Sequence, residues 1–208
     1  MIAVDSLLAR GVNQLGLSLA PEVLQKLADY ATLLMKWNKT YNLTAVRDFD
    51  QIIALHLLDS LSIVSFLRDE ALLDVGSGAG FPGIPLALAC PDIAVTLLDS
   101  NSKKSAFQQQ AVITLGLSNV KVVNARVENF KPECLYSQIV SRAFAELSDF
   151  VRETSPLLAK NGRWLAMKGL HPAAEIIRLP SSVKVELETR LSVPGVDAER
   201  HLIVIREK

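Results

Sequence analysis

Three glycines, Gly76, Gly78 and Gly80, follow a short apolar run that ends at Asp74-Val75. Glycines at such a place let the backbone turn tightly and lie against a ligand. A helix is expected to begin near Pro82-Gly83, and its first turn would offer free N–H groups to that ligand. Asp99 ends the next apolar run. A carboxylate there can accept hydrogen bonds from both hydroxyls of a ribose, so the pattern predicts a site for a cofactor that carries a nucleoside.

Two features of this loop bear on which cofactor it binds. Gly78-x-Gly80-x-x-Gly83 also fits the dinucleotide fingerprint, which is a weak signal by itself. However, Asp74 stands two residues before the first glycine, and the chain ends in two strands with no helix between them. Both features resemble the class I methyltransferases that use S-adenosylmethionine (SAM). We therefore expect the cofactor to be SAM. One alternative is an NAD-dependent oxidoreductase, and another is a purely structural loop whose glycines only pack a helix against a strand.

The elements that must position this loop fall into two parts. Residues 1–68 have helical periodicity and are expected to form an N-terminal helical extension. Its predicted helices cover residues 4–15, 21–35 and 50–67, and Asp48 and Gln51 stand at capping-box spacing before the third. The segment 37–44 between the last two is too polar for a core and too aromatic for a plain linker.

From residue 69 to residue 208, short apolar runs alternate with helical segments. This alternation predicts an α/β fold with a doubly wound, mostly parallel, Rossmann-like sheet of seven strands. The last two strands are joined at Pro194-Gly195 without a helix, so they must form an antiparallel hairpin. The expected strands are 71–76, 94–99, 120–124, 137–141, 163–168, 183–193 and 201–206, and the expected helices after the loop helix are 102–115 and 147–158.

The composition excludes several classes of protein. The 208 residues carry 22 basic and 22 acidic side chains, so binding to nucleic acid by bulk attraction is not expected and a local patch would be needed. The basic excess lies in residues 121–208. Cys90 and Cys134 are too few for a zinc ribbon or a disulfide scaffold, and we expect both to be inert and no metal to be bound. Because no leader and no membrane-spanning run are recognised, a cytoplasmic protein without a membrane partner is expected.

A series of short motifs makes the resemblance more specific than a superfamily. In order and with compatible spacing, the chain resembles the RsmG (GidB) family of bacterial methyltransferases over nearly its whole length. Any one of these motifs would be weak, but seven in order are specific. They are Trp37-Asn38-Lys39-x-Tyr41-Asn42-Leu43-Thr44, His56-x-Leu58-Asp59-Ser60, Phe81-Pro82-Gly83-Ile84-Pro85-Leu86, Leu97-Leu98-Asp99-Ser100, Arg126-Val127-Glu128, Ser141-Arg142-Ala143-Phe144-Ala145 and Glu199-Arg200-His201-Leu202.

The resemblance implies a SAM-dependent enzyme that methylates N7 of a guanine in 16S ribosomal RNA. Its partner would be that RNA or the small ribosomal subunit, and we expect the protein to be a monomer. A non-catalytic RNA-binding assembly factor is a third hypothesis. The family's cofactor contacts fall on Gly76, Phe81, Val127, Glu128 and Arg142, and the glycine-loop argument adds Gly78 and Asp99.

Arg142 follows the fourth strand, where its side chain should face the reactive end of the cofactor, and we take it as the catalytic candidate. Its role would be positioning, because guanine N7 already carries a lone pair and needs no general base. Arg126, Lys168 and Arg200 stand at or just beyond strand ends and are the candidate RNA contacts.

Other polar residues are left with open interpretations. His56 and Asp59 are three residues apart on a predicted helix, could bond each other, and are taken as structural. Lys103 and Lys104 open a helix, where cations oppose the helix dipole. Asn38, Tyr41 and Asn42 fit either an RNA contact or a turn between helices.

Overall fold

The protein, described here by a computed structural model, is built around one seven-stranded sheet. The structure describes residues 6–142, 144 and 146–208. Val4 of the first expected helix therefore lies outside the described residues, as do Ala143 and Ala145 of the motif at the end of the fourth expected strand. The strand order is β3-β2-β1-β4-β5-β7-β6. Strands β1 to β5 pair in parallel, and β7 pairs antiparallel with both β5 and β6, which confirms the predicted fold class. The strands are β1 Leu72–Val75, β2 Val95–Asp99, β3 Val120–Asn124, β4 Tyr136–Ser141, β5 Leu158–Lys168, β6 Val183–Arg190 and β7 His201–Glu207.

The order of the strands creates a switch point beside β1. Strand β2 lies on one side of β1 and β4 on the other, so the connections leave in opposite directions there. In open parallel sheets, ligands bind outside the carboxyl ends of the strands at such a point. The loop after β1 is the glycine loop, so the fold places it at the expected binding edge.

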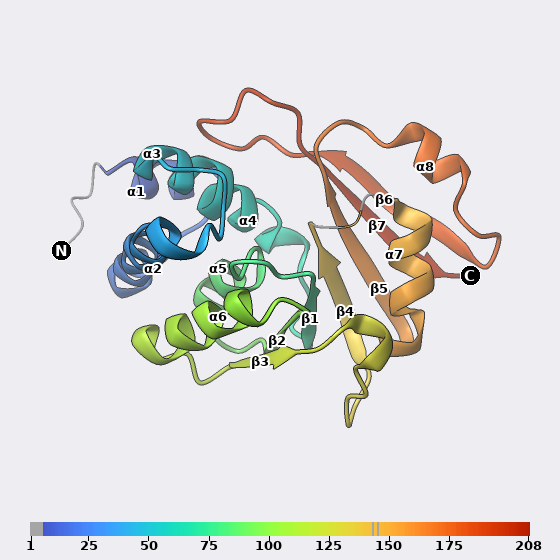
Figure 1. Ribbon diagram of the computed structural model, residues 1–208. Coiled ribbons are helices and arrows are strands. Elements are labelled where there is room, and N and C mark those ends of the chain that lie inside the picture. The colour runs from blue at the N-terminus through green and yellow to red at the C-terminus, as the bar shows by residue number, and fades with distance from the viewer. Residues whose placement is uncertain (1–5, 143, 145) are drawn as a thin grey trace.

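Helices cover both faces of the sheet (Figure 1), and an apolar core lies between the sheet and the helices on each face. On one face, Leu72, Leu97 and Val204 pack against the N-terminal helices and the helices that follow β1 and β2. On the other face, Leu73 and Trp164 belong to the core that includes the helix after β4. The helices that follow the glycine loop and the strands are α5 Gly83–Ala89, α6 Ser102–Leu115, α7 Leu147–Thr154 and α8 Ala173–Ile177, with short 3-10 turns at Val127–Asn129 and Ser155–Leu157.

The N-terminal extension is helical, as predicted, but its second helix is longer than expected. Helix α2 continues to Tyr41 and ends at Asn42, whose φ is 50°. The aromatic residues that argued against a plain linker do pack, since the Trp37 ring lies 5.1 Å from the Tyr41 ring and 5.6 Å from the Phe107 ring between centroids. Asn38 is buried and bonds the backbone of Thr44 and Val46. The first two helices are α1 Leu7–Gln14 and α2 Pro21–Tyr41.

The third expected helix is broken into pieces. Asp48 caps its start, accepting a 2.9 Å hydrogen bond from the Gln51 N–H, as the spacing predicted. A π-helical turn then interrupts it, which apolar periodicity does not reveal. The pieces are α3 Phe49–Ile52, the π-helix Ile53–Leu58, α4 Asp59–Leu61 and a 3-10 turn Val64–Phe66. The stretch Phe49–Phe66 is long and apolar enough to cross a membrane, but half of it is buried inside the protein, as in the core helix of a soluble domain.

Three differences occur in the C-terminal half. Strand β6 ends at Arg190 rather than at residue 193. Strand β5 begins at Leu158 rather than at residue 163, and the helix before it ends correspondingly earlier, at Thr154. Helix α8 was not predicted, because its five residues are too few to show a helical period.

Candidate functional site

The glycine loop has the backbone conformation that its residues suggested. Gly76, Gly78 and Gly80 all have positive φ, at 69°, 60° and 90°. A Cβ at Gly78 would meet only the Gly76 carbonyl, 3.9 Å away, so the space beside it is open. The loop therefore exposes its backbone to a ligand at Gly78, where a side chain would take up that space.

Side chains from β2 and α6 hold this loop in place. Asp99 accepts hydrogen bonds from the Gly78 N–H at 2.7 Å and from the Asn101 N–H at 2.8 Å. Gln108 donates to Ser77 Oγ at 2.8 Å and to the Gly78 carbonyl at 2.7 Å. Asp99 thus has a structural role that the sequence argument did not include, and its carboxylate retains lone pairs for a ribose.

A hollow of 230 Å³ opens on the β2–β3 side of the loop. It brings together the predicted residues Gly76, Asp99, Val127 and Glu128, which are far apart in sequence. An apolar wall next to an acid suits a flat purine attached to a ribose. Arg126 also lies here, so it is separated from the other two candidate RNA contacts. The lining residues are Val75, Gly76, Leu98, Asp99, Ser100, Ala125, Arg126, Val127, Glu128, Phe144 and Glu153.

A second hollow, of 180 Å³, lies on the other side of the loop and also touches Gly76. It contains the predicted residues Gly78, Phe81 and Arg142. Its remaining wall comes from the N-terminal extension. Two hollows that share Gly76 fit a long cofactor, with a nucleoside in one and an amino-acid end in the other. The lining residues are Leu43, Thr44, His56, Gly76, Ser77, Gly78, Ala79, Phe81 and Arg142.

Asp74 is a buried acid below the loop. Its Oδ2 accepts a 2.8 Å hydrogen bond from the Gly83 N–H at the start of α5, whereas Oδ1 has no hydrogen-bond partner. Burial raises the pKa of Asp74 to about 7, against the lowering effect of the Gly83 hydrogen bond and of Arg142. Asp74 is 0% exposed and lines neither hollow, so its charge would favour a cationic group such as the amino group of SAM through space and not by direct contact.

We expect SAM binding near pH 7 to release protons. With a pKa of about 7, Asp74 is partly protonated there. A nearby cation favours the ionised carboxylate and lowers this pKa, so up to about half a proton should leave at pH 7. The observed binding enthalpy should therefore vary with the ionisation enthalpy of the buffer, and Asp74→Asn should remove that dependence. A buffer-independent enthalpy in the unaltered protein would contradict this role.

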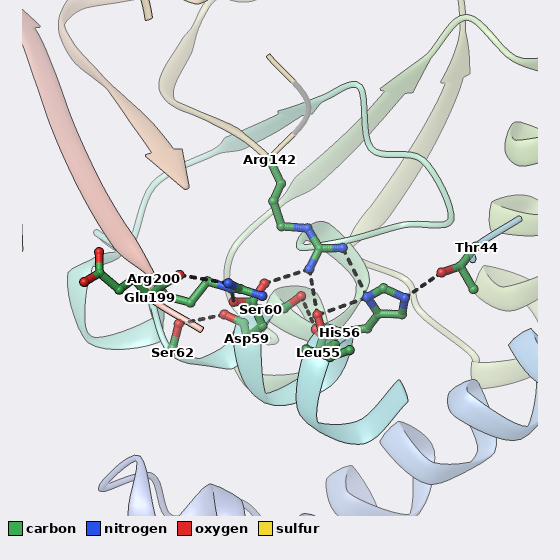
Figure 2. Close-up of polar contacts among 9 residues, drawn as sticks. All are labelled: Thr44, Leu55, His56, Asp59, Ser60, Ser62, Arg142, Glu199 and Arg200. Atoms are coloured by element: carbon green, nitrogen blue, oxygen red, sulfur yellow. Dashed lines mark hydrogen bonds and ion pairs between the residues drawn. The ribbon is translucent and has the colours of Figure 1, made fainter. Parts of the chain in front are cut away.

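Arg142 lies at the centre of a polar cluster that joins β4 to the N-terminal extension (Figure 2). Its Nη1 donates to Asp59 Oδ2 at 2.8 Å and to the Leu55 carbonyl at 3.2 Å. The other Asp59 oxygen accepts from Arg200 Nε at 2.9 Å. Asp59 is 2% exposed and pairs with two arginines that are about a quarter exposed. One buried carboxylate thus fixes both guanidinium groups.

His56 and Asp59 do not bond each other, although their spacing allowed it. The His56 Nε2 lies 2.8 Å from Thr44 Oγ1, and its Nδ1 lies 3.0 Å from the Leu55 carbonyl and 3.5 Å from Arg142 Nη2. The pKa of His56 is lowered to about 4, chiefly by burial and next by the charge of Arg142. The charge of Asp59 raises this pKa by less than that of Arg142 lowers it. His56 is therefore neutral at pH 7, and its ring stacks on Phe81 at 4.8 Å.

The π-helical turn explains how these groups meet. The Asp59 N–H bonds to the carbonyls of Ala54 and His56, not to that of Leu55, which an α-helix would use. The Leu55 carbonyl faces Arg142 instead. Such turns are frequent at functional sites because they redirect side chains and carbonyls.

A third cavity, of 420 Å³, adjoins the second hollow, since His56 and Arg142 line both. It contains Lys168 and Arg200, two of the predicted RNA contacts. The Lys168 side chain is 11% exposed and its ammonium pairs with Glu175 at 2.7 Å, so Lys168 is less accessible than the sequence suggested. The lining residues are Val46, Leu55, His56, Asp59, Arg142, Met167, Lys168, Gly169, Leu191, Arg200 and His201.

Several site residues were missed by the sequence argument. Leu43 and Thr44 line the second hollow from the loop after α2, whereas Tyr30 on α2 and Gln108 on α6 bond the glycine loop itself. Leu43 and Thr44 end the motif at residues 37–44, which was an available signal, whereas a single glutamine inside a helix gives none. Among the described residues, no three histidine, cysteine or acidic side chains form a metal-binding group.

The sheet order, the acid before the glycine loop and the two hollows that meet at Gly76 define a class I, SAM-type methyltransferase. Solved structures show the same fold at low sequence identity. TrmN from Thermus thermophilus matches with a TM-score of 0.58 and 21% identity over 72% of this chain and 47% of that one. Coclaurine N-methyltransferase, solved with N-methylheliamine and SAH, matches with a TM-score of 0.58 and 15% identity over 89% of this chain and 70% of that one.

The family is more specific than the class. The family model described as rRNA small subunit methyltransferase G matches residues 23–203, and the chain belongs to this family. The protein of that name from Aromatoleum aromaticum is 53% identical over 95% of this chain and 96% of its own length. Its counterpart from Neisseria meningitidis serogroup C is 52% identical over 97% of both chains. The predicted family is therefore confirmed.

Proposed function

We propose that this protein transfers the methyl group of SAM to N7 of a guanine in 16S ribosomal RNA. The observation that carries this proposal is the junction at His56 and Arg142, which line both the second cofactor hollow and the 420 Å³ cavity. An acceptor base in the larger cavity would meet the reactive end of a cofactor at that junction. Two relatives whose sequences are more than 50% identical to this chain are named for the small-subunit ribosomal RNA, and these names support that RNA as the substrate.

The chemistry fits the absence of a strong base at this junction. When bound, SAM supplies an electrophilic methyl group on a sulfonium. Guanine N7 has an in-plane lone pair and no proton to remove, so catalysis depends on holding the two atoms about 3 Å apart and in line. His56, with a pKa of about 4, is neutral and does not repel the sulfonium.

Arg142 is well placed to orient the acceptor base. Its guanidinium is fixed by Asp59 and Leu55, and it lies 5.5 Å from the centre of the Phe81 ring. Guanine O6 lies next to N7 on the same edge and is a strong acceptor for arginine. Arg142 would bind O6 in the plane of the base and leave N7 free, which avoids placing a cation over a ring that becomes positive.

The RNA must present its guanine in an open conformation. In A-form RNA the major groove, which contains N7, is deep and narrow, so side chains do not reach it. A guanine in a loop or one turned out of its stack would enter the cavity. Arg200 and Lys168 would then contact flanking phosphates in exchange for part of their pairing with Asp59 and Glu175.

We expect Arg200→Ala and Lys168→Ala to weaken RNA binding and leave SAM affinity unchanged. Each lost phosphate contact should flatten the slope of log affinity against log salt by about 0.7–0.9. Arg152→Ala is the matched control, because Arg152 is 66% exposed, pairs with Asp149 on α7 and lines none of the three cavities described. Unchanged salt slopes in Arg200→Ala and Lys168→Ala would contradict the assignment of these two residues as phosphate contacts.

The direct test is methyl transfer from labelled SAM to 16S RNA and to small subunits that lack the modification. Digestion and mass spectrometry then identify the modified nucleotide. An assembly factor without activity would bind the RNA and transfer nothing, and a dehydrogenase would bind NAD rather than SAM. Comparing naked RNA with subunits also identifies the true substrate. A monomer that acts in the cytoplasm is the simplest form for this activity and is part of the proposal.

A further inference from the structure

Tyr30 links the N-terminal extension directly to the glycine loop. It lies on α2, is fully buried, and its hydroxyl donates a hydrogen bond to the Ala79 carbonyl, 49 positions later in the chain. Ala79 lies between Gly78 and Gly80 and lines the second cofactor hollow. The extension thus supports the backbone of the loop from behind.

The packing around this hydroxyl is close. A Cβ on Gly80 would lie 2.7 Å from the Tyr30 oxygen and 2.5 Å from Ile84 Cδ1, so only glycine lets the loop approach α2 this closely. The Tyr30 ring also lies 5.2 Å from the Phe81 ring and 6.0 Å from the Phe107 ring. Tyr30 therefore fixes both the carbonyl before Gly80 and the aromatic residue after it.

We propose that Tyr30 is a positioning residue for the cofactor. It touches neither hollow itself, but it sets the place of Ala79 and Phe81, which line the second hollow. Asp99 and Gln108 hold the Gly78 end of the loop. Tyr30 holds the other end, so the loop is preformed in the shape that receives the ligand, and less ordering is needed when SAM binds.

This role separates Tyr30 from an ordinary buried tyrosine. Without the hydroxyl, the Ala79 carbonyl would be buried without its partner, and the loop would shift to regain one. SAM would then have to restore the loop to its binding conformation, and the free energy of that step would reduce the observed affinity for SAM. The loss would affect the ground state and the transition state alike, so it should raise the KM for SAM more than it lowers kcat.

The test compares Tyr30→Phe with Tyr136→Phe in the full chain. Tyr136 is also buried, and its hydroxyl bonds Thr96 Oγ1 at 3.0 Å, but it lines neither cofactor hollow. We expect Tyr30→Phe to bind S-adenosylhomocysteine about 10-fold more weakly by calorimetry, which corresponds to about 1.4 kcal/mol. Tyr136→Phe should stay within about twofold of the unaltered protein although it also loses a buried hydrogen bond.

A second measurement covers a variant that is too unstable to titrate. The rise in Tm that a fixed concentration of S-adenosylhomocysteine produces depends on its affinity, so it remains measurable in a marginally stable protein. Tyr30→Phe should show a smaller rise than Tyr136→Phe. Equal rises in the two variants, or a Tyr30→Phe affinity within twofold of the unaltered protein, would show that Tyr30 only stabilises the fold.

Discussion

Gly78→Val should abolish measurable SAM binding and leave the protein folded. A Cβ at position 78 would meet only the Gly76 carbonyl, at 3.9 Å, and Gly78 lines the second hollow, so the valine side chain would take up space in that hollow. That space is where the loop backbone must approach the ligand. We expect SAM affinity to fall by at least about 100-fold, or about 2.8 kcal/mol, measured by calorimetry with SAM and S-adenosylhomocysteine.

Gly116→Val provides a matched control for backbone strain. Gly116 has a φ of 63°, close to the 60° of Gly78, and a Cβ there would also meet nothing within 4 Å. It ends α6, whereas the loop contacts come from within that helix. Both valines should lower stability by about 1–2 kcal/mol, the cost of a left-handed conformation. SAM affinity should fall in Gly78→Val alone, and an unchanged affinity there would remove the glycine loop from the cofactor site.

Arg142→Ala should lower methyl transfer by about 100- to 1,000-fold, the usual effect of losing a preorganised hydrogen-bond donor. It should also weaken SAM binding, because Arg142 lines the second hollow and lies over the Phe81 ring. Arg142→Lys should not restore activity, since one ammonium cannot make the fixed set of contacts to Asp59, Leu55 and an acceptor base. Single-turnover methylation with saturating SAM separates the chemical step from cofactor binding.

Arg200→Ala is the control for this prediction because both arginines share Asp59. Each variant leaves the buried Asp59 with one guanidinium partner, so the cost in stability should be similar. Arg200 does not line the second hollow. SAM affinity should therefore hold in Arg200→Ala while RNA affinity falls. Equal losses of SAM affinity in Arg142→Ala and Arg200→Ala would mean that both arginines act only by pairing with Asp59 to support the fold, and that Arg142 has no separate role in cofactor binding.

Both predictions depend on residues that the sequence already singled out. Gly78 stands in a short pattern of an acidic residue and glycines after an apolar run, and Asp99 ends the next apolar run. Such patterns can be recognised in the sequence because each involves only a few neighbouring residues. Helix α6 and strand β3 also have the bounds that the sequence predicts. Gly116 at the helix end and the unbroken apolar runs of the strands give clear local signals.

The sequence was less informative about contacts between distant segments. The spacing allowed His56 and Asp59 to bond each other, whereas each faces a partner from elsewhere in the chain. The sequence also grouped Arg126 with Lys168 and Arg200 as RNA contacts, although Arg126 lines the 230 Å³ hollow and the other two line the 420 Å³ cavity. Spacing along a helix shows which residues share a face, but it does not show what packs against that face.

The sequence by itself determined the sheet, its terminal hairpin, the glycine loop and the family, because alternating apolar runs, turn residues and motifs are local patterns. Only the tertiary structure decided that the extension lines the second hollow, beside the glycine loop. Tyr30 meets Ala79, and Asp59 holds Arg142 and Arg200, through contacts between segments 49 to 141 positions apart. Such contacts arise when α2 and the π-helical turn pack against the sheet. Burial then leaves each polar group dependent on one specific partner, since a buried group without a partner is costly.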